Sequence, residues 1–192
     1  EDEGHLFIGC AGGKDTLVKF ENNKKKLNGD FKCFKISVSG LKGGHSGDDI
    51  NKGLGNAVKI ITRLLWNAFE KFGVRISSVD AGNLRNAIAR EAVAVICIPV
   101  NKTDDFNRFV TLYSVMVKDE LKLTDPGLTI EMTSVAKTDS VIDIDLQQRL
   151  LLSLYGCPHG VIAMTPDMPG LVETSTNLAS VKTLDNEIII QT

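Results

Sequence analysis

Changes in the period of the hydrophobic pattern constrain the fold of this chain more than any other feature. Phe34, Ile36 and Val38 alternate with polar residues, which is typical of a half-buried strand. Over residues 54–69 the apolar residues instead recur every three to four positions, which predicts one face of a helix that Gly73 can terminate. The glycine-rich stretch between these two patterns must therefore be a strand-to-helix connection.

Further along the chain the same two patterns repeat. They predict strands over residues 74–80, 91–100 and 128–135 and a helix over 106–121. The order over residues 31–135 is then β-α-β-β-α-β. This order most simply folds as a ferredoxin-like α+β domain, a four-stranded antiparallel sheet with both helices on one face.

The last third of the chain continues with regular elements. The pattern predicts one helix near residues 142–155 and strands over 160–165, 170–183 and 187–192. We expect a single domain over 1–192, with a core over 31–135 and an extension over 136–192. The chain begins at Glu1 rather than Met, so we also expect it to be part of a longer protein.

Composition excludes several classes of protein. A hydrophobic content of 43% in 192 residues predicts a folded domain, and a net charge of −2 gives no general attraction to nucleic acid or to an anionic membrane. No stretch approaches the roughly 18 consecutive apolar residues of a membrane span. The strand over 91–100 carries no aromatic residue, which argues against an RNA-binding sheet.

The four cysteines, Cys10, Cys33, Cys97 and Cys157, are far apart and form no CxxC pair. This spacing favours neither a zinc knuckle nor a dense disulfide framework. We therefore expect reduced, buried thiols in a cytoplasmic protein.

The sequence GGHSG places His45 among glycines in the strand-to-helix connection. In one interpretation the glycines only supply positive φ angles, and His45 is a solvated loop residue. In the other they leave room for a ligand, and the imidazole donates a hydrogen bond to a developing oxyanion. A metal site with Asp48 and Asp49 is disfavoured because no second histidine lies at ligand spacing.

Two further segments concentrate polar residues. The segment AGNLRNAIARE is either a polar connection between strands or a surface that recognises a carboxylate. The segment ETSTNLASV places Glu173, Ser175 and Asn177 on one face of a strand, and such a row usually faces water. His5 and His159 show no partner pattern and are expected at the surface.

Four long segments, read together, are more specific than any one motif. They are EDEGHLFIGCAGG, GLKGGHSGDDINKGLGNAVKIITRLL, GNLRNAIAREA and GLVETSTNLASV. In this order they closely resemble the middle of the aminoacyl-histidine (Xaa-His) dipeptidases, a family of di-zinc exopeptidases. The resemblance covers essentially the whole chain, and it implies an inserted lid, or dimerisation, domain with the β-α-β-β-α-β fold.

The resemblance also implies roles for individual residues. His45 matches the lid histidine that stabilises the tetrahedral oxyanion. Substrate contacts are expected, by motif position, from Asn86, Arg90, Asn83, Ser175 and Asn177. The two zinc ions would be held by the catalytic domain of the same polypeptide, outside this chain, so the chain alone should not hydrolyse dipeptides. A homodimer through an apolar sheet edge or helix face is also expected.

Two other interpretations stay open at the level of sequence. The chain could be a free-standing ferredoxin-like module whose glycine loop binds a small ligand. Alternatively, the parent could be an inactive relative of the peptidases that serves in binding or regulation.

Overall fold

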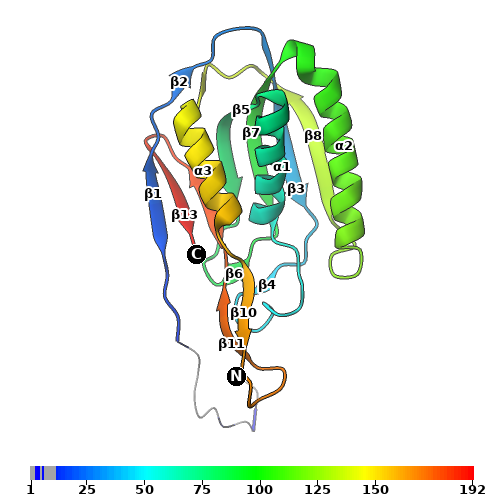
Figure 1. Cartoon of the computed structure of the whole chain (residues 1–192), viewed down its shortest axis with the longest axis vertical. Helices are drawn as coiled ribbons and strands as arrows, with labels where there is room; N and C mark the ends of the chain where they lie inside the picture. Colours follow the sequence, from blue (N-terminus) through cyan, green and yellow to red (C-terminus); the bar gives the residue numbers. More distant parts are fainter. Residues whose placement is uncertain (1–2, 5, 7–11) are drawn as a thin grey trace.

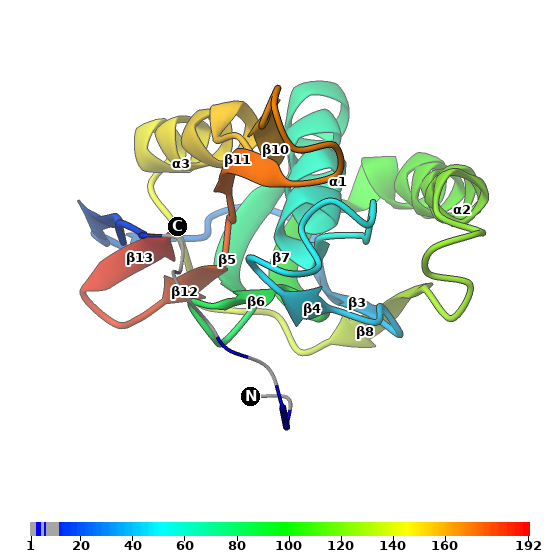
Figure 2. The ribbon, with the colours of Figure 1, turned by 90° about the horizontal axis from the view of Figure 1, so that it is seen from below.

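Seven strands form one antiparallel sheet, and three helices lie on one of its faces (Figures 1 and 2). The computed structural model describes residues 3, 4, 6 and 12–192. In their order across the sheet the strands are β1 (Leu17–Glu21), β13 (Glu187–Gln191), β12 (Ser180–Thr183), β5 (Arg75–Ala81), β7 (Ala92–Pro99), β3 (Phe31–Ser39) and β8 (Thr129–Val135). The helices are α1 (Ala57–Phe72), α2 (Thr103–Glu120), which follows the 3-10 turn η1 (Val100–Lys102), and α3 (Ile144–Gly156).

Three short ribbons complete the fold outside the main sheet. Each pairs two strands antiparallel: β2 (Lys25–Lys26) with β9 (Ser140–Val141), β4 (Gly44–His45) with β6 (Ala87–Ile88), and β10 (Gly160–Met164) with β11 (Val172–Thr176). The β4–β6 and β10–β11 ribbons lie at the same end of the molecule, beyond the end of α1 (Figure 1).

The mixed α+β architecture is confirmed, and so is the order β3-α1-β5-β7-α2-β8. The sheet, however, has seven strands rather than four. Two of the additional strands, β12 and β13, come from the extension over 136–192, and β1 comes from before the core. The predicted strand over 170–183 is in fact two strands in different sheets, because the chain leaves β11 after Thr176 and enters β12 at Ser180.

The core lies between the sheet and the helices, where the alternating and helical patterns meet. Ile36 on β3, Ile96 on β7 and Ile61 on α1 are all completely buried in it. The side chain of Asn56 caps α1 by accepting hydrogen bonds from the backbone N–H groups of Val58 and Lys59. Gly73 ends the helix with φ 68°. The helix therefore ends where the pattern predicts, but it begins at Ala57, after Asn56, rather than at residue 54 where the apolar pattern starts.

The expectation of reduced cysteines is wrong for two of them. Cys33 and Cys97 lie directly opposite each other on β3 and β7, with Cα atoms 4.1 Å apart, and form a disulfide. They lie in a second, smaller apolar cluster with Leu27 and Val141. The pairing was not visible in the sequence because 64 positions separate the two residues. Cys157 is a free, half-buried thiol, and Cys10 lies outside the described residues.

The residue before β1, Thr16, lies beside the last residue, Thr192. Thr16 and Thr192 exchange two backbone hydrogen bonds, of 2.9 and 3.1 Å, and β1 pairs with β13 along its whole length. Among the described residues, no helix combines the length and the apolar character needed to span a membrane.

Candidate functional site

The β4–β6 ribbon positions the loop that carries His45. Gly44 pairs with Ile88 and His45 with Ala87, and the backbone N–H of Ser46 donates to the Asn86 carbonyl at 2.9 Å. Two of the predicted site residues, His45 and Asn86, therefore lie next to each other although 41 positions separate them in the sequence.

The imidazole of His45 is 52% exposed, and its Nδ1 atom accepts two backbone N–H groups, from Gly47 at 3.1 Å and Asp48 at 3.3 Å. A carboxylate oxygen of Asp48 also lies 3.6 Å from Nδ1, which by distance alone suggests an ion pair. We favour the hydrogen bonds over the ion pair. A backbone N–H can only donate, so Nδ1 must carry a lone pair to accept it. The neutral ring then has its proton on Nε2, where it is available to an incoming acceptor.

The glycines around His45 are required by close packing. The Asp49 carboxylate folds back to accept the His45 N–H at 2.6 Å, and a Cβ atom on Gly44 would lie 2.7 Å from that carboxylate. Two hydrogen bonds lower the pKa of Asp49. The larger effect comes from the Lys52 side chain, and the smaller one comes from the backbone N–H of His45. Gly44 thus lets the chain fold tightly around Asp49, while the His45 side chain stays half exposed.

A groove of about 820 Å³ adjoins this loop. It is lined by residues 12–14 and 170–175 together with Gly47, Asp48 and Asn51. Ser175, on β11, is the predicted site residue that lies in this groove, and it is exposed.

Two other predicted residues, Asn83 and Arg90, line a separate groove of about 200 Å³. Arg90 lies beside Gly43, since a Cβ on Gly43 would be 3.2 Å from the Cβ of Arg90. In the antiparallel register Gly43 and Gly47 flank β4 at opposite ends. Ser175 therefore lies in a groove at one end of the β4–β6 ribbon, and Asn83 and Arg90 lie in a groove at the other end. His45 and Asn86 lie on the ribbon and its connection and line neither groove.

Asn177 lies behind the ribbon rather than in either groove. It is 8% exposed, and its Nδ2 donates to the carbonyls of Ala87 at 2.9 Å and Arg85 at 3.4 Å. Its Oδ1 atom has no hydrogen-bond partner among the described residues. With its amide nitrogen committed to these carbonyls, Asn177 supports the segment that contains Asn86.

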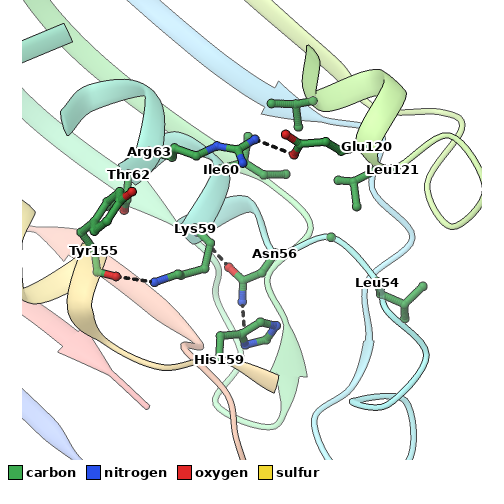
Figure 3. A pocket seen from close by; sticks show the side chains of 12 residues that line it. Leu54, Asn56, Lys59, Ile60, Thr62, Arg63, Glu120, Leu121, Tyr155 and His159 are labelled. Atoms are coloured by element: carbon green, nitrogen blue, oxygen red, sulfur yellow. Dashed lines mark hydrogen bonds and ion pairs between the residues drawn. The ribbon is translucent and has the colours of Figure 1, made fainter. Parts of the chain in front are cut away.

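A third groove, of about 460 Å³, lies against the helices and contains His159 (Figure 3). His159 was expected at the surface, but it is half-buried, and Figure 3 shows its ring beside Asn56. Its Nδ1 lies 3.2 Å from Nδ2 of Asn56 and accepts the N–H of Leu178 at 3.3 Å. Burial, and then the positive charge of Lys59, lower the pKa of His159 to about 4.

Lys59 also lines this groove, and no pattern in the sequence pointed to it. Its Nζ donates to the carbonyls of Leu154, Tyr155 and Cys157 at 2.8 to 3.1 Å, which satisfies the last carbonyls of α3. None of the six predicted site residues lines this groove. Asn56 did carry a signal in the sequence, because asparagine is a typical N-cap residue, although the apolar pattern starts two positions before it.

The zinc ions implied by the resemblance have no candidate ligands here. In the part of the chain that the structure describes, no three His, Cys, Asp or Glu residues are grouped so that they could hold a metal ion.

Comparisons with known proteins agree with this architecture. Residues 31–125 match the family model described as peptidase dimerisation domain. The chain is 36% identical over 190 residues to the cytosol non-specific dipeptidase of Escherichia coli (strain K12), covering 99% of this chain and 39% of that protein. It also resembles the crystal structure of aminoacylhistidine dipeptidase from Vibrio alginolyticus, with a TM-score of 0.89 and 33% identity over 92% of this chain and 36% of that one. Residues 31–125 therefore form a peptidase dimerisation domain, and nearly the whole chain is similar to part of two dipeptidases.

Proposed function

We propose that this chain is the lid and dimerisation domain of a dipeptidase that hydrolyses Xaa-His dipeptides, and that His45 stabilises the oxyanion formed during the reaction. The observation that carries the proposal is the state of the His45 ring. Two backbone N–H groups donate to Nδ1, which leaves Nε2 as the ring atom that can donate, and the side chain is 52% exposed. A fixed donor of this kind stabilises negative charge as it develops on a carbonyl oxygen.

Substrate contacts are assigned to the exposed polar residues around the same ribbon. Arg90 can bind a carboxylate with two hydrogen bonds, and Asn83 lines the same groove. Asn86 and Ser175 lie toward the other end, next to the His45 loop. In this proposal Asn177 acts indirectly, by holding the strand that carries its neighbours.

The catalytic machinery itself would belong to other parts of the parent protein. The chain spans about two fifths of the length of the relatives it matches. Because Thr16 and Thr192 lie side by side, the domain can be inserted into another domain without separating the parts of the latter. The two zinc ions that the family resemblance implies would be held there, since the described residues offer no such group. The related dipeptidase is named as cytosolic, which supports a cytoplasmic parent.

A homodimer is proposed through the outer face of α2. Leu112, Val115 and Met116 are exposed on this helix although all three are apolar. The neighbouring strand β8 is an edge of the sheet and can pair with a second strand. Replacing Leu112 with Asp should convert the dimer to a monomer in analytical ultracentrifugation, whereas an unchanged sedimentation coefficient would exclude this face.

The test of the proposed activity is hydrolysis of a panel of dipeptides by the full-length parent protein. The panel should contain Xaa-His and Xaa-Ala pairs, because the relatives include a non-specific dipeptidase and an aminoacylhistidine dipeptidase. Higher kcat/KM for the Xaa-His member of each pair is expected, together with no hydrolysis by this chain alone. Equal rates on both members would remove the Xaa-His assignment, and an inactive parent that binds dipeptides would favour a binding module.

A further inference from the structure

Asp125 is a buried carboxylate that no part of the proposed chemistry uses. It is 1% exposed and lies in the turn between α2 and β8. Its Oδ1 accepts the backbone N–H of Lys42 at 2.8 Å, and its Oδ2 accepts the backbone N–H of Gly55, also at 2.8 Å. Both oxygens of one side chain thus bind the backbone at the two ends of the loop that contains His45.

Asp125 is itself held firmly in place. Its backbone N–H donates to the carbonyl of Leu121 at 2.8 Å, and its carbonyl accepts the N–H of Leu128 at 3.1 Å. The turn also packs directly against the start of the loop, where Gly40 lies so close to the Gly127 carbonyl that a Cβ atom would clash with it. The carboxylate is therefore a rigid point to which the loop is attached.

We propose that Asp125 is a positioning residue for His45, acting by closing the base of the loop over residues 42–55. This inference rests on the proposed role of His45. His45 is three positions after Lys42, and the hydrogen bonds inside the loop, from His45 to Asp49 and from Gly47 to His45, fix its ring only relative to the loop. The bonds to Asp125, together with the short pairing of β4 with β6, fix the loop relative to the sheet.

Two substitutions remove these bonds to different extents. Asp125→Asn keeps the shape of the side chain but has only one acceptor oxygen, so one of the two backbone N–H groups would face an NH₂ donor. Asp125→Ala removes both acceptors. Asp119→Asn is the matched control, because Asp119 is an exposed carboxylate on α2 whose one side-chain partner among the described residues is Lys122, two residues after the helix ends.

The first readout is hydrogen exchange, measured by mass spectrometry on the full-length protein. In Asp125→Ala we expect peptides covering residues 42–55 to exchange at least about tenfold faster, with α1 and the sheet unchanged and a smaller effect in Asp125→Asn. The control Asp119→Asn should match the wild type. Unchanged exchange of the loop in Asp125→Ala would overturn the proposal.

The second readout is dipeptide hydrolysis by the same proteins. Because a small displacement of a catalytic group is costly, kcat should fall roughly 10- to 100-fold in Asp125→Ala while KM changes less than about threefold. If Asp125 acts through His45, adding Asp125→Ala to a His45→Ala variant should cause little further loss. An equally large further loss would show that Asp125 acts elsewhere. If the wild type proves inactive on dipeptides, the proposed function fails, and the exchange result still decides whether Asp125 holds the loop.

Discussion

The helix-covered sheet and the His45 loop are neighbours in the sequence, but different interactions stabilise them. Between the sheet and the helices, Ile36, Ile61 and Ile96 are fully buried among other apolar side chains. Over residues 40–53 of the loop only Leu41 and Ile50 are buried apolar residues. The loop is shaped instead by backbone hydrogen bonds to carboxylates and to the β6 segment.

Stability and site geometry therefore depend on separate sets of residues. Burial of apolar area is non-directional and contributes to the stability of the whole domain. A hydrogen bond to a buried carboxylate contributes less net free energy but fixes direction. Substitutions in the two regions should therefore change different measured quantities, and the following predictions test this separation.

The largest effect on stability is expected in the sheet. Replacing Ile61 with Ala leaves a cavity between α1 and the sheet and should lower the free energy of unfolding by about 2–5 kcal/mol in urea denaturation. Leu123→Ala, at a residue that is 87% exposed, should change it by less than about 0.5 kcal/mol. Equal losses in the two variants would show that apolar burial does not dominate this region.

The next largest expected effect is a pH dependence of the free energy of unfolding, caused by His159, which lies in the extension and contacts Asn56 at the start of α1. The pKa of His159 is about 4 in the folded chain and about 6.5 in the unfolded chain, so the unfolded state binds the proton first as the pH falls. The contribution of neutral His159 is complete above pH 6.5 and is lost between pH 6.5 and 4, at a cost of up to about 3 kcal/mol.

A His159→Gln variant isolates this contribution, because glutamine does not titrate. Its free energy of unfolding should fall less steeply than that of the wild type between pH 6.5 and 4. Parallel curves for the two proteins would mean that His159 titrates normally and is not held neutral by burial.

A smaller effect is expected from two glycines with similar backbone angles. Gly40 and Gly73 have φ of 77° and 68°, but only Gly40 has a backbone carbonyl in the space that a Cβ would occupy. Gly73→Ala should cost about 1 kcal/mol from its backbone angle alone. Gly40→Ala should cost at least about 1 kcal/mol more, because the loop must move away from Gly127. Equal costs, measured by thermal unfolding, would show that this close approach is unimportant.

The sequence predicts the periodic parts of the molecule well. The strand around Ile36 and the helix ending at Gly73 follow from local spacing, and the structure has both. The edge strand β1 was missed because its residues are largely exposed and show no clear alternation. The separation of β11 from β12 was missed because Asn177 and Leu178 are polar and apolar residues that also fit a continuous strand.

The candidate site was only partly predictable, for a different reason. The glycines around His45 mark an unusual loop, but the choice between a solvated turn and a functional loop depended on the family resemblance. The burial of His159 and the two hydrogen bonds that Asp125 accepts from the loop depend on contacts between residues that are far apart in the sequence. Asp125 binds residues 70 and 83 positions away, and no local pattern reports such a contact.

The most direct test of the account is dipeptide hydrolysis by the full-length parent protein and by its His45→Ala variant, with metal content and unfolding measured in both. We predict that kcat falls about 100- to 1000-fold, as expected for the loss of one oxyanion donor, while the metal content and the free energy of unfolding stay the same. Turnover within about threefold of the wild type would contradict the account and leave His45 a solvated residue of a structural lid.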